Sequence, residues 1–475
     1  MKRTCLIAQA GACSAALRAL LPLRLEGRVS GLSGLVVEVD GLSSHLSVGD
    51  RLTLEARDRR SVPAEVVAFR QGRAQAMPFA SLDGLGPGSR ALACGERLAI
   101  GGGGSLAVSD AWLGRVLDPL GRSLDGQGPL PPGPRTRKLR ASPPHATDRA
   151  RLGPPLDLGV RALNCFATCR DGQRLGLFAG SGVGKSTLLA MLARYTACDV
   201  AVLALVGERG REVREFMEDD LGPDGLARSV VVVATSDSPP LLRREAAYAA
   251  MTVAEHFRDQ GKSVLLLMDS VTRFCLALRE IGLSAGEPPA TRGYPPSVFA
   301  ELPRLLERAG PGVPPSVSRG RLTGTAVRTE PAHAEAGAGR ITALFTVLVE
   351  GDDHNEPVAD AVRGILDGHV ILDRRIAEGG RYPAVDVLRS LSRTVPGCLE
   401  PEQAAVAARA RAILALHADM ADLVRLGAYR AGTDPAVDEA VALAPRIEQA
   451  LRQTRTQRSS LAESFALLRA AVTPG

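Results

Sequence analysis

The chain has 475 residues, of which 45% are hydrophobic and 23% are charged, and its formal net charge is +6. This hydrophobic fraction excludes an intrinsically disordered protein, and the length is enough for about two to four domains. No apolar run approaches the roughly 18 residues of a membrane-spanning helix. The eight cysteines are scattered along the chain, which is typical of a reducing compartment rather than of a disulfide framework. We therefore expect a cytoplasmic protein of several domains.

Short strand-like stretches dominate residues 25–98. Two of them, residues 35–39 and 51–55, border on turn signals at Asp40-Gly41 and Gly49-Asp50. Such closely spaced strands predict a small β-barrel or sandwich. Residues 1–24 form a separate N-terminal segment before this domain. The glycine- and proline-rich residues 99–156 after it are interpreted as a linker and connection.

Strand-like and helical stretches alternate in residues 157–395. Apolar runs at residues 174–178, 200–206, 230–234 and 264–268 predict buried strands. A helix expected after Ser238-Pro239 carries small and apolar residues on one face and charged residues such as Arg244 and Glu255 on the other. This alternation predicts an α/β domain with a parallel sheet. Residues 396–475, which are rich in Ala, Leu and Arg, predict a helical C-terminal domain.

A glycine-rich loop follows the first of these strands and opens a helix. It matches the phosphate-binding pattern Gly-x-x-x-x-Gly-Lys-[Ser/Thr], except that Ala179 takes the first position. Backbone N–H groups and the helix N-terminus would surround phosphate oxygens, Lys185 would neutralise the β- and γ-phosphates, and Ser186 would bind Mg²⁺. Lysine occurs only four times in the chain, which makes a chance Lys in this loop improbable. The candidate nucleotide-binding residues are Gly180, Ser181, Gly182, Val183, Gly184, Lys185, Ser186 and Thr187.

Two carboxylates follow other predicted strands. Asp269 ends the apolar run at residues 264–268, where phosphate-loop enzymes hold magnesium through an Asp. Glu208 follows the run at residues 200–206 and is a candidate for polarising the attacking water. From the pattern alone, Glu208 and Arg209 are equally compatible with a charge pair on the surface after a strand.

The region from residue 176 to residue 393 resembles the catalytic subunits of rotary ATP synthases. It resembles most closely the type III secretion ATPases of flagella and injectisomes. Residues 178–187, 207–215, 266–274, 279–299 and 382–393 carry the resemblance, together with residues 113–118 and 121–126. The resemblance extends over nearly the whole chain beyond residue 25. It implies an N-terminal β-barrel, a central RecA-like ATPase domain with a parallel sheet, and a C-terminal helical domain.

The resemblance also implies roles for individual residues. Glu208 matches the catalytic carboxylate that orients water, and Arg209 matches a neighbour that contacts the γ-phosphate or the subunit border. Asp269 matches the carboxylate that holds magnesium, partly through water. Tyr382 matches the aromatic residue that stacks on adenine, although plain packing is the alternative. Arg393 matches an arginine finger that reaches into a neighbouring site, although an exposed surface arginine is the alternative.

The presence of Glu208 and Arg393 on one chain has a consequence for assembly. In rotary synthases, these two functions are supplied by different subunit types. A ring of identical copies of this chain could build a complete site at every interface. We therefore expect a homohexamer with six equivalent sites.

The resemblance implies Mg²⁺-dependent ATP hydrolysis that powers protein export through the flagellar type III apparatus, and the injectisome is the close alternative. A remote alternative is an RNA translocase, but residues 25–98 contain only Phe69 and Phe79 as aromatic residues on which bases could stack. A subunit of an ATP synthase is equally remote.

The implied partners are other copies of the chain, the regulator and stalk proteins of the export apparatus, export substrates and their chaperones. We also expect a peripheral contact with the membrane-embedded export gate. We expect no nucleic-acid partner. The implied location is cytoplasmic, peripheral to the inner membrane. Neither the cargo, nor the role of the N-terminal segment, nor the oligomeric state of the free chain follows from the sequence.

Overall fold

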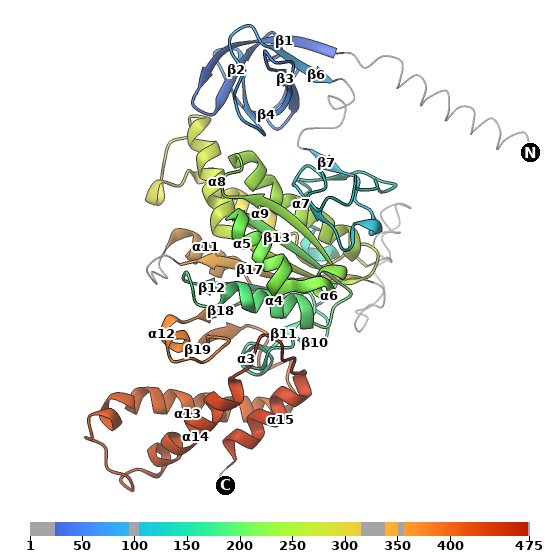
Figure 1. Cartoon of the computed structure of the whole chain (residues 1–475). Coiled ribbons are helices and arrows are strands. Elements are labelled where there is room, and N and C mark those ends of the chain that lie inside the picture. Colours follow the sequence, from blue (N-terminus) through green and yellow to red (C-terminus); the bar gives the residue numbers. More distant parts are fainter. Residues whose placement is uncertain (1–23, 95–103, 315–337, 350–355, 474–475) are drawn as a thin grey trace, which may run out of the picture.

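The structure is a computed structural model, and it describes residues 24–94, 104–314, 338–349 and 356–473. Three parts follow one another along the molecule: a barrel at one end, a large sheet with helices in the middle, and a helical domain at the other end (Figure 1). The predicted fold class is thus confirmed. Almost all of the predicted N-terminal segment, residues 1–24, lies outside the described residues.

The N-terminal part is a closed barrel of six strands in the order β1-β2-β5-β4-β3-β6. Every neighbouring pair is antiparallel. Alternate residues such as Leu52 and Leu54 point into a small apolar core, as the two-residue period of a strand requires. The strands are β1 (Arg24–Ser33), β2 (Val36–Asp40), β3 (Arg51–Glu55), β4 (Ser61–Arg70), β5 (Arg73–Pro78) and β6 (Arg90–Cys94).

Residues 104–156 are packed onto the rest of the molecule, although the sequence suggests only a linker and connection. Strand β8 pairs in parallel with β14 and so becomes one edge of the large sheet. Trp112 is buried, and its Nε1 donates to the carbonyl of Pro131 at 2.8 Å. The short elements here are β7 (Ser105–Leu106), η1 (Asp110–Trp112), β8 (Val116–Leu117), β9 (Arg137–Lys138), η2 (Ala146–Asp148) and β10 (Pro155–Leu156).

The central sheet has the strand order β19-β18-β12-β17-β15-β13-β14-β8. Its ladders are parallel except for β19 at one edge and the short β16 beside β17. Both faces are covered, so its strands are continuous apolar runs. Besides β8, its strands are β12 (Arg174–Ala179), β13 (Val200–Glu208), β14 (Ser229–Thr235), β15 (Ser263–Asp269), β16 (Gly310–Pro311), β17 (Arg340–Leu348), β18 (Gly368–Leu372) and β19 (Val385–Ser392). The short β11 (Cys169–Arg170) pairs with β10 in a separate two-stranded sheet.

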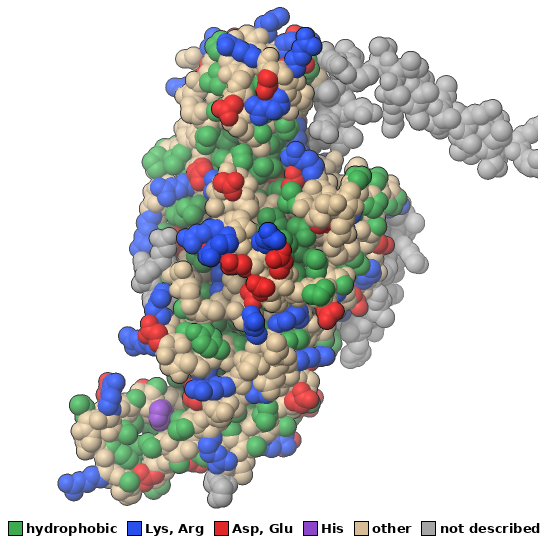
Figure 2. Space-filling model, in the orientation of Figure 1, with side chains coloured by type: hydrophobic (Ala, Val, Ile, Leu, Met, Phe, Trp, Pro, Cys, Tyr) green, Lys and Arg blue, Asp and Glu red, His purple; other side chains and the backbone are tan. Residues whose placement is uncertain are grey.

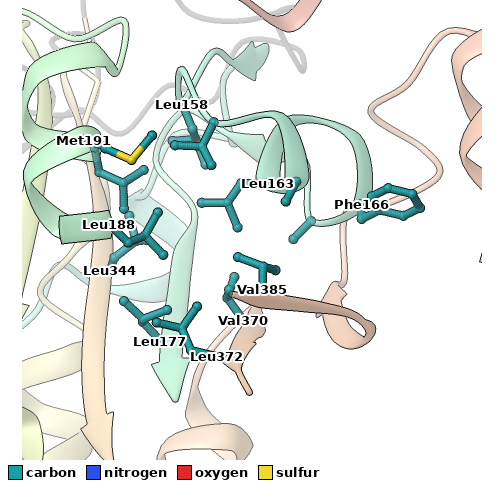
Figure 3. Packing of buried hydrophobic residues seen from close by; sticks show 14 of the residues in the cluster. Leu158, Leu163, Phe166, Leu177, Leu188, Met191, Leu344, Val370, Leu372 and Val385 are labelled. Carbon is teal, nitrogen blue, oxygen red and sulfur yellow. The ribbon is translucent and has the colours of Figure 1, made fainter. Parts of the chain in front are cut away.

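Helices cover this sheet on both sides. Leu203 and Leu205 of β13 face one core, whereas the alternate Val202 and Val206 face the other. Figure 3 shows the first core, where Leu188 of α4 packs near the strands that lead to the glycine-rich loop. The helices are α3 (Arg161–Phe166), α4 (Lys185–Tyr195), α5 (Gly210–Glu215), η3 (Phe216–Leu221), α6 (Gly222–Ala227), α7 (Pro240–Arg258), α8 (Val271–Ser284), η4 (Thr291–Gly293), α9 (Pro296–Leu306), α11 (Pro357–Ile365) and α12 (Arg374–Glu378).

Helix α7 differs from the simple amphipathic pattern in its sequence. Both faces are buried, because Arg244 on its charged face is only 4% exposed and Glu255 only 7%. Arg244 pairs with Glu65 of the barrel at 2.6 Å, and Glu255 pairs with Arg308 at 2.7 Å. The barrel and the chain after α9 therefore cover a face that local periodicity assigns to solvent.

The C-terminal part consists of α13 (Pro401–Arg425), α14 (Pro435–Leu451) and α15 (Leu461–Val472). Leu443, Ile447 and Phe465 of these helices belong to the same buried cluster as residues of α3 and α4. The helical domain is thus seated on the central domain through a shared apolar core. Among the described residues, no helix is long and apolar enough to cross a membrane.

Candidate active site

The glycine-rich loop joins the carboxyl end of β12 to the first turn of α4, as predicted. Gly182 and Gly184 have φ angles of 77° and 88°, a backbone region that strongly favours glycine. The first bond of the helix runs from the N–H of Leu188 to the carbonyl of Gly184. The N–H groups at positions 185–187 precede that bond and so have no partner within the helix. The loop therefore has the geometry of an anion-binding helix N-terminus.

Lys185 brings the two predicted carboxylates together. Its Nζ donates to Oδ1 of Asp269 and lies 3.4 Å from Oε1 of Glu208. Asp269 and Glu208 end the neighbouring strands β15 and β13, which pair in parallel. The carboxyl ends of parallel strands meet at one edge of the sheet, so the three groups converge there. Thr346 of β17 donates to the same oxygen of Asp269 at 2.7 Å.

Arg273, from the first turn of α8, holds the other oxygen of Glu208. Its Nη1 lies 2.8 Å from Oε2 of Glu208 and also donates to the carbonyl of Gly207. Gly207 has a φ of 72°, and a Cβ there would lie 2.9 Å from Cδ of Arg273. A side chain at position 207 would therefore displace Arg273. Arg273 and Asp269 both lie in residues 266–274, one of the stretches that carry the family resemblance, but nothing in that stretch indicates a contact between Arg273 and Glu208.

The pKa of the Glu208 carboxyl is raised above its ordinary value, mainly because burial removes the carboxylate from water. The cations of Lys185 and Arg273 oppose this effect, whereas the negative charge of Asp269 adds to it. Glu208 is only 8% exposed. A partly desolvated carboxylate between two cations is suited to accept a hydrogen bond from a water molecule and to polarise it.

Tyr382 lies beside the loop. A Cβ at Gly184 would lie 3.4 Å from two atoms of its ring. Tyr382 is 47% exposed, which disfavours the alternative of plain core packing. It lines a cavity of about 690 Å³, together with Gly184, Thr187 and residues of the helical domain. An exposed aromatic ring at the edge of a cavity of this size is suited to stack on a flat ligand.

The structure does not bring Arg209 and Arg393 to this cluster. The side chain of Arg209 is 74% exposed and pairs with Glu212 at 3.0 Å, within a stretch of mixed charges around α5 on the face shown in Figure 2. The backbone N–H of Arg393 donates to the carbonyl of Asp367, next to the first residue of β12. The loop follows the last residue of β12, five residues and roughly 16 Å farther along the strand.

One further contact to the loop was missing from the sequence analysis. Nη2 of Arg374, at the start of α12, donates to the carbonyl of Ser181 at 3.1 Å. Arg374 follows β18, the strand beside β12, so the sheet places it next to the loop. No sequence pattern indicates this role, because arginine is the most abundant charged residue of the chain.

These residues fit the groups that the sequence implied. Positive-φ glycines and free helix N–H groups suit phosphate oxygens, and Lys185 supplies the mobile positive charge. Asp269 and the exposed Ser186 at the second position of α4 offer the oxygen ligands that Mg²⁺ prefers. Among the described residues, no cluster of three or more His, Cys, Asp and Glu side chains could hold a metal by itself. A magnesium ion here would therefore depend on phosphate oxygens and water for its remaining ligands.

Comparisons with known proteins agree with this geometry. The family model "ATP synthase alpha/beta family, nucleotide-binding domain" matches residues 159–392, and the model "T3SS EscN ATPase C-terminal domain" matches residues 399–470. The "Flagellum-specific ATP synthase" of Caulobacter vibrioides is 52% identical over 454 residues, which cover 96% of this chain and 97% of that protein. The "Type 3 secretion system ATPase" of Xanthomonas euvesicatoria is 45% identical, with 94% of this chain and 93% of that protein covered.

A solved structure shares the whole architecture. It is the assembled ATPase EscN in complex with its central stalk EscO, from the type III secretion system of enteropathogenic E. coli. Its TM-score is 0.79 at 38% sequence identity, and the match covers 94% of this chain and 100% of that chain. The family expected from the sequence is thereby confirmed. The chain belongs to the family of flagellum-specific ATP synthases and type III secretion ATPases, relatives of the rotary ATP synthase subunits.

Proposed function

We propose that the chain hydrolyses ATP with Mg²⁺ and that this hydrolysis powers protein export through a flagellar type III apparatus. The observation that carries the proposal is the convergence of Lys185, Glu208 and Asp269 at the carboxyl edge of the sheet, beside the glycine-rich loop. ATP in this site would place its phosphates against the loop and its base beside Tyr382. Ser186 and Asp269 would hold Mg²⁺, which neutralises charge on the transferred phosphate when bound.

The residues of the chain then have distinct tasks. The loop amides and Lys185 bind and orient the β- and γ-phosphates. Glu208 accepts a hydrogen bond from the attacking water and aligns it. Arg273 keeps the carboxylate of Glu208 fixed and ionised. Phosphoryl transfer requires mainly such positioning and charge stabilisation, because the protein forms no covalent bond to the phosphate.

The active assembly that we propose is a homohexamer. Arg393 is exposed and lies on the edge of the sheet opposite to its own phosphate loop. This position supports the proposal that Arg393 acts on a neighbouring chain rather than on its own site, as an arginine finger does. Arg209 is equally exposed near α5 and would lie at the border with a neighbour. The assembled state of the related EscN agrees with this arrangement.

The partners that we propose are a stalk protein in the centre of the ring, a regulator at the N-terminal segment, and export substrates with their chaperones. Contact with the membrane-embedded export gate would be peripheral, from the cytoplasmic side. The related EscN has a central stalk, EscO, in its solved complex. We propose no nucleic-acid partner. Phe79 in the barrel is buried beneath Arg51, whereas Phe69 is 40% exposed, and one exposed ring is not a platform on which successive bases could stack.

Export through an injectisome is the second candidate. The chain is 45% identical to the secretion ATPase of Xanthomonas, and it is also 45% identical to the flagellar relative from Pseudomonas aeruginosa. Two measurements test the proposal. Phosphate release from ATP should require Mg²⁺, and no release would contradict the enzyme activity. Deletion of the gene should abolish secretion of flagellar hook and filament proteins, whereas loss of another secreted set would favour the injectisome.

A further inference from the structure

The cavity beside Tyr382 lies between the central domain and the helical domain, and six of its fourteen lining residues come from the helical domain. Residues 452–460 connect α14 to α15, and these six lining residues belong to this loop or to the end of α14. They are Gln449, Arg452, Gln453, Thr454, Arg455 and Gln457. The base half of a nucleotide would therefore lie between the central domain and the helical domain.

Gln453 attaches this loop to the central domain through hydrogen bonds of its backbone and its side chain. It is only 4% exposed, and its backbone N–H donates to the carbonyl of Tyr382 at 2.9 Å. Its side-chain Oε1 accepts from the N–H of Arg161 at 3.0 Å. Its Nε2 donates to the carbonyls of Gly159 at 2.8 Å and Gln457 at 2.6 Å. Because its donors and its acceptor oxygen are already engaged, Gln453 holds the wall in place rather than recognising a ligand directly.

Two arginines of the central domain also donate hydrogen bonds to carbonyl groups of this loop. Arg161 of α3 donates to the carbonyl of Arg452 at 2.7 Å. Arg194 of α4 donates to the carbonyl of Arg455 at 2.6 Å. Helix α4 begins at Lys185, so a single helix carries the phosphate-binding lysine at one end and a support of the base wall at the other.

We infer that Gln453 is a positioning residue for the base of the nucleotide, because it sets the spacing between the ring of Tyr382 and the facing loop of the helical domain. This inference rests on the proposed function. Loss of the Gln453 side chain would remove its bonds to Arg161 and Gly159, so the loop could move and its backbone bond to the carbonyl of Tyr382 would no longer hold the ring and the opposite wall at a fixed spacing. The phosphate loop has its own supports, Arg374 and Asp269, and would keep its geometry.

The test compares two ligands of the same site, Mg²⁺-ATP and inorganic Mg²⁺-tripolyphosphate, which lacks the base and the sugar. In the Gln453→Ala full-length chain, the Kd for ATP should rise by roughly tenfold or more, since a small misplacement of a binding group has an effect of that order. The Kd for tripolyphosphate should stay within about twofold, and kcat at saturating ATP within about threefold. Thr456→Ala is the matched control, because Thr456 is exposed in the same loop and does not line the cavity. It should leave all three values unchanged.

The other possible results of this experiment distinguish a failure of the inference from a failure of the proposed function. Unchanged ATP affinity in Gln453→Ala, or an equal loss for ATP and tripolyphosphate, would overturn the inference while leaving the proposed function intact. A wild-type chain that binds neither ligand would instead overturn the proposed function. If Gln453→Ala does not fold, Arg194→Met removes the donor to the carbonyl of Arg455 and so loosens the loop from α4, and Arg194 does not line the cavity. It should again weaken ATP more than tripolyphosphate, and equal affinities would overturn the inference.

Discussion

The guanidinium of Arg273 lies 2.8 Å from Oε2 of Glu208, while Lys185 lies near the other oxygen of the same carboxylate. One carboxylate is thus held between two cations that come from different helices, α8 and α4. Asp269 balances the second positive charge. The four groups form a neutral cluster at the edge of the sheet, and each of them can be removed separately.

Glu208→Gln should preserve ATP binding and remove hydrolysis. The amide keeps the shape of the side chain and can still accept from Arg273, but it polarises water far less than a carboxylate does. The loss of one negative charge leaves the cluster more positive, so binding of the anionic nucleotide should not weaken. The measurements are ATP affinity and steady-state phosphate release. A parallel loss of both would show that Glu208 has a structural role.

Lys185→Ala should reduce turnover by at least about a hundredfold, since a lost charge contact to the reacting group has an effect of this size. It would also leave Glu208 and Asp269 facing the phosphates without their common cation. Lys262→Ala is a control, because Lys262 is another of the four lysines and lies over Phe257, away from the loop. Phosphate release in Lys185→Ala within about threefold of wild type would contradict the phosphate-loop assignment.

The rate of hydrolysis should fall on acidification at a pH above the ordinary glutamate value of 4.5. The carboxylate form of Glu208 is the active one, and burial raises the pKa of this group. Arg273 lowers that pKa, so Arg273→Gln should raise it further and move the acidic limb of the kcat profile to higher pH. Arg304→Gln, on the exposed surface of α9, should leave the limb in place. Movement of the limb to lower pH would contradict the contact between Arg273 and Glu208.

The parts of the site that lie at strand ends were predictable from the sequence. The apolar runs before Glu208 and Asp269 predict buried parallel strands, and the carboxyl ends of such strands meet at one edge. The glycines and Lys185 follow a pattern whose spacing is fixed by the shape of the loop itself. Local sequence is sufficient in these cases because each group belongs to its own short run of residues, either a strand with the carboxylate at its end or the glycine-rich loop itself.

Contacts between distant elements were not predictable in this way. The contact of Arg273 with Glu208 depends on the pairing of β15 with β13 and on the positive φ of Gly207. Arg244 occupies the charged face of α7, yet it is buried because Glu65, 179 residues away, supplies a partner from the barrel. Periodicity identifies which residues share a face, but it contains no information about what covers that face.

Arg393→Ala should reduce hydrolysis by about 10³- to 10⁵-fold, which is the contribution of an arginine finger supplied in trans. Arg393 lies at the end of the sheet opposite to its own loop, so we expect its effect to require a neighbouring chain. The activity of the wild-type chain per molecule should accordingly rise with protein concentration. Arg389→Ala is the matched control, because Arg389 is exposed on β19, the strand that ends one residue before Arg393, and pairs with Asp373. A mild defect in Arg393→Ala would indicate an ordinary surface arginine.

Mixing Arg393→Ala with Glu208→Gln chains should restore part of the activity. Each variant alone builds rings in which every interface is defective. In a mixed ring, some interfaces join an intact Glu208 on one chain to an intact Arg393 on the next, and these sites contain every catalytic group. Even a few repaired sites should exceed the residual rate, because the finger contributes several orders of magnitude. Phosphate release is measured for each variant and for equimolar mixtures after subunit exchange. A severe single-variant defect without gain on mixing, despite proven exchange, would contradict action in trans.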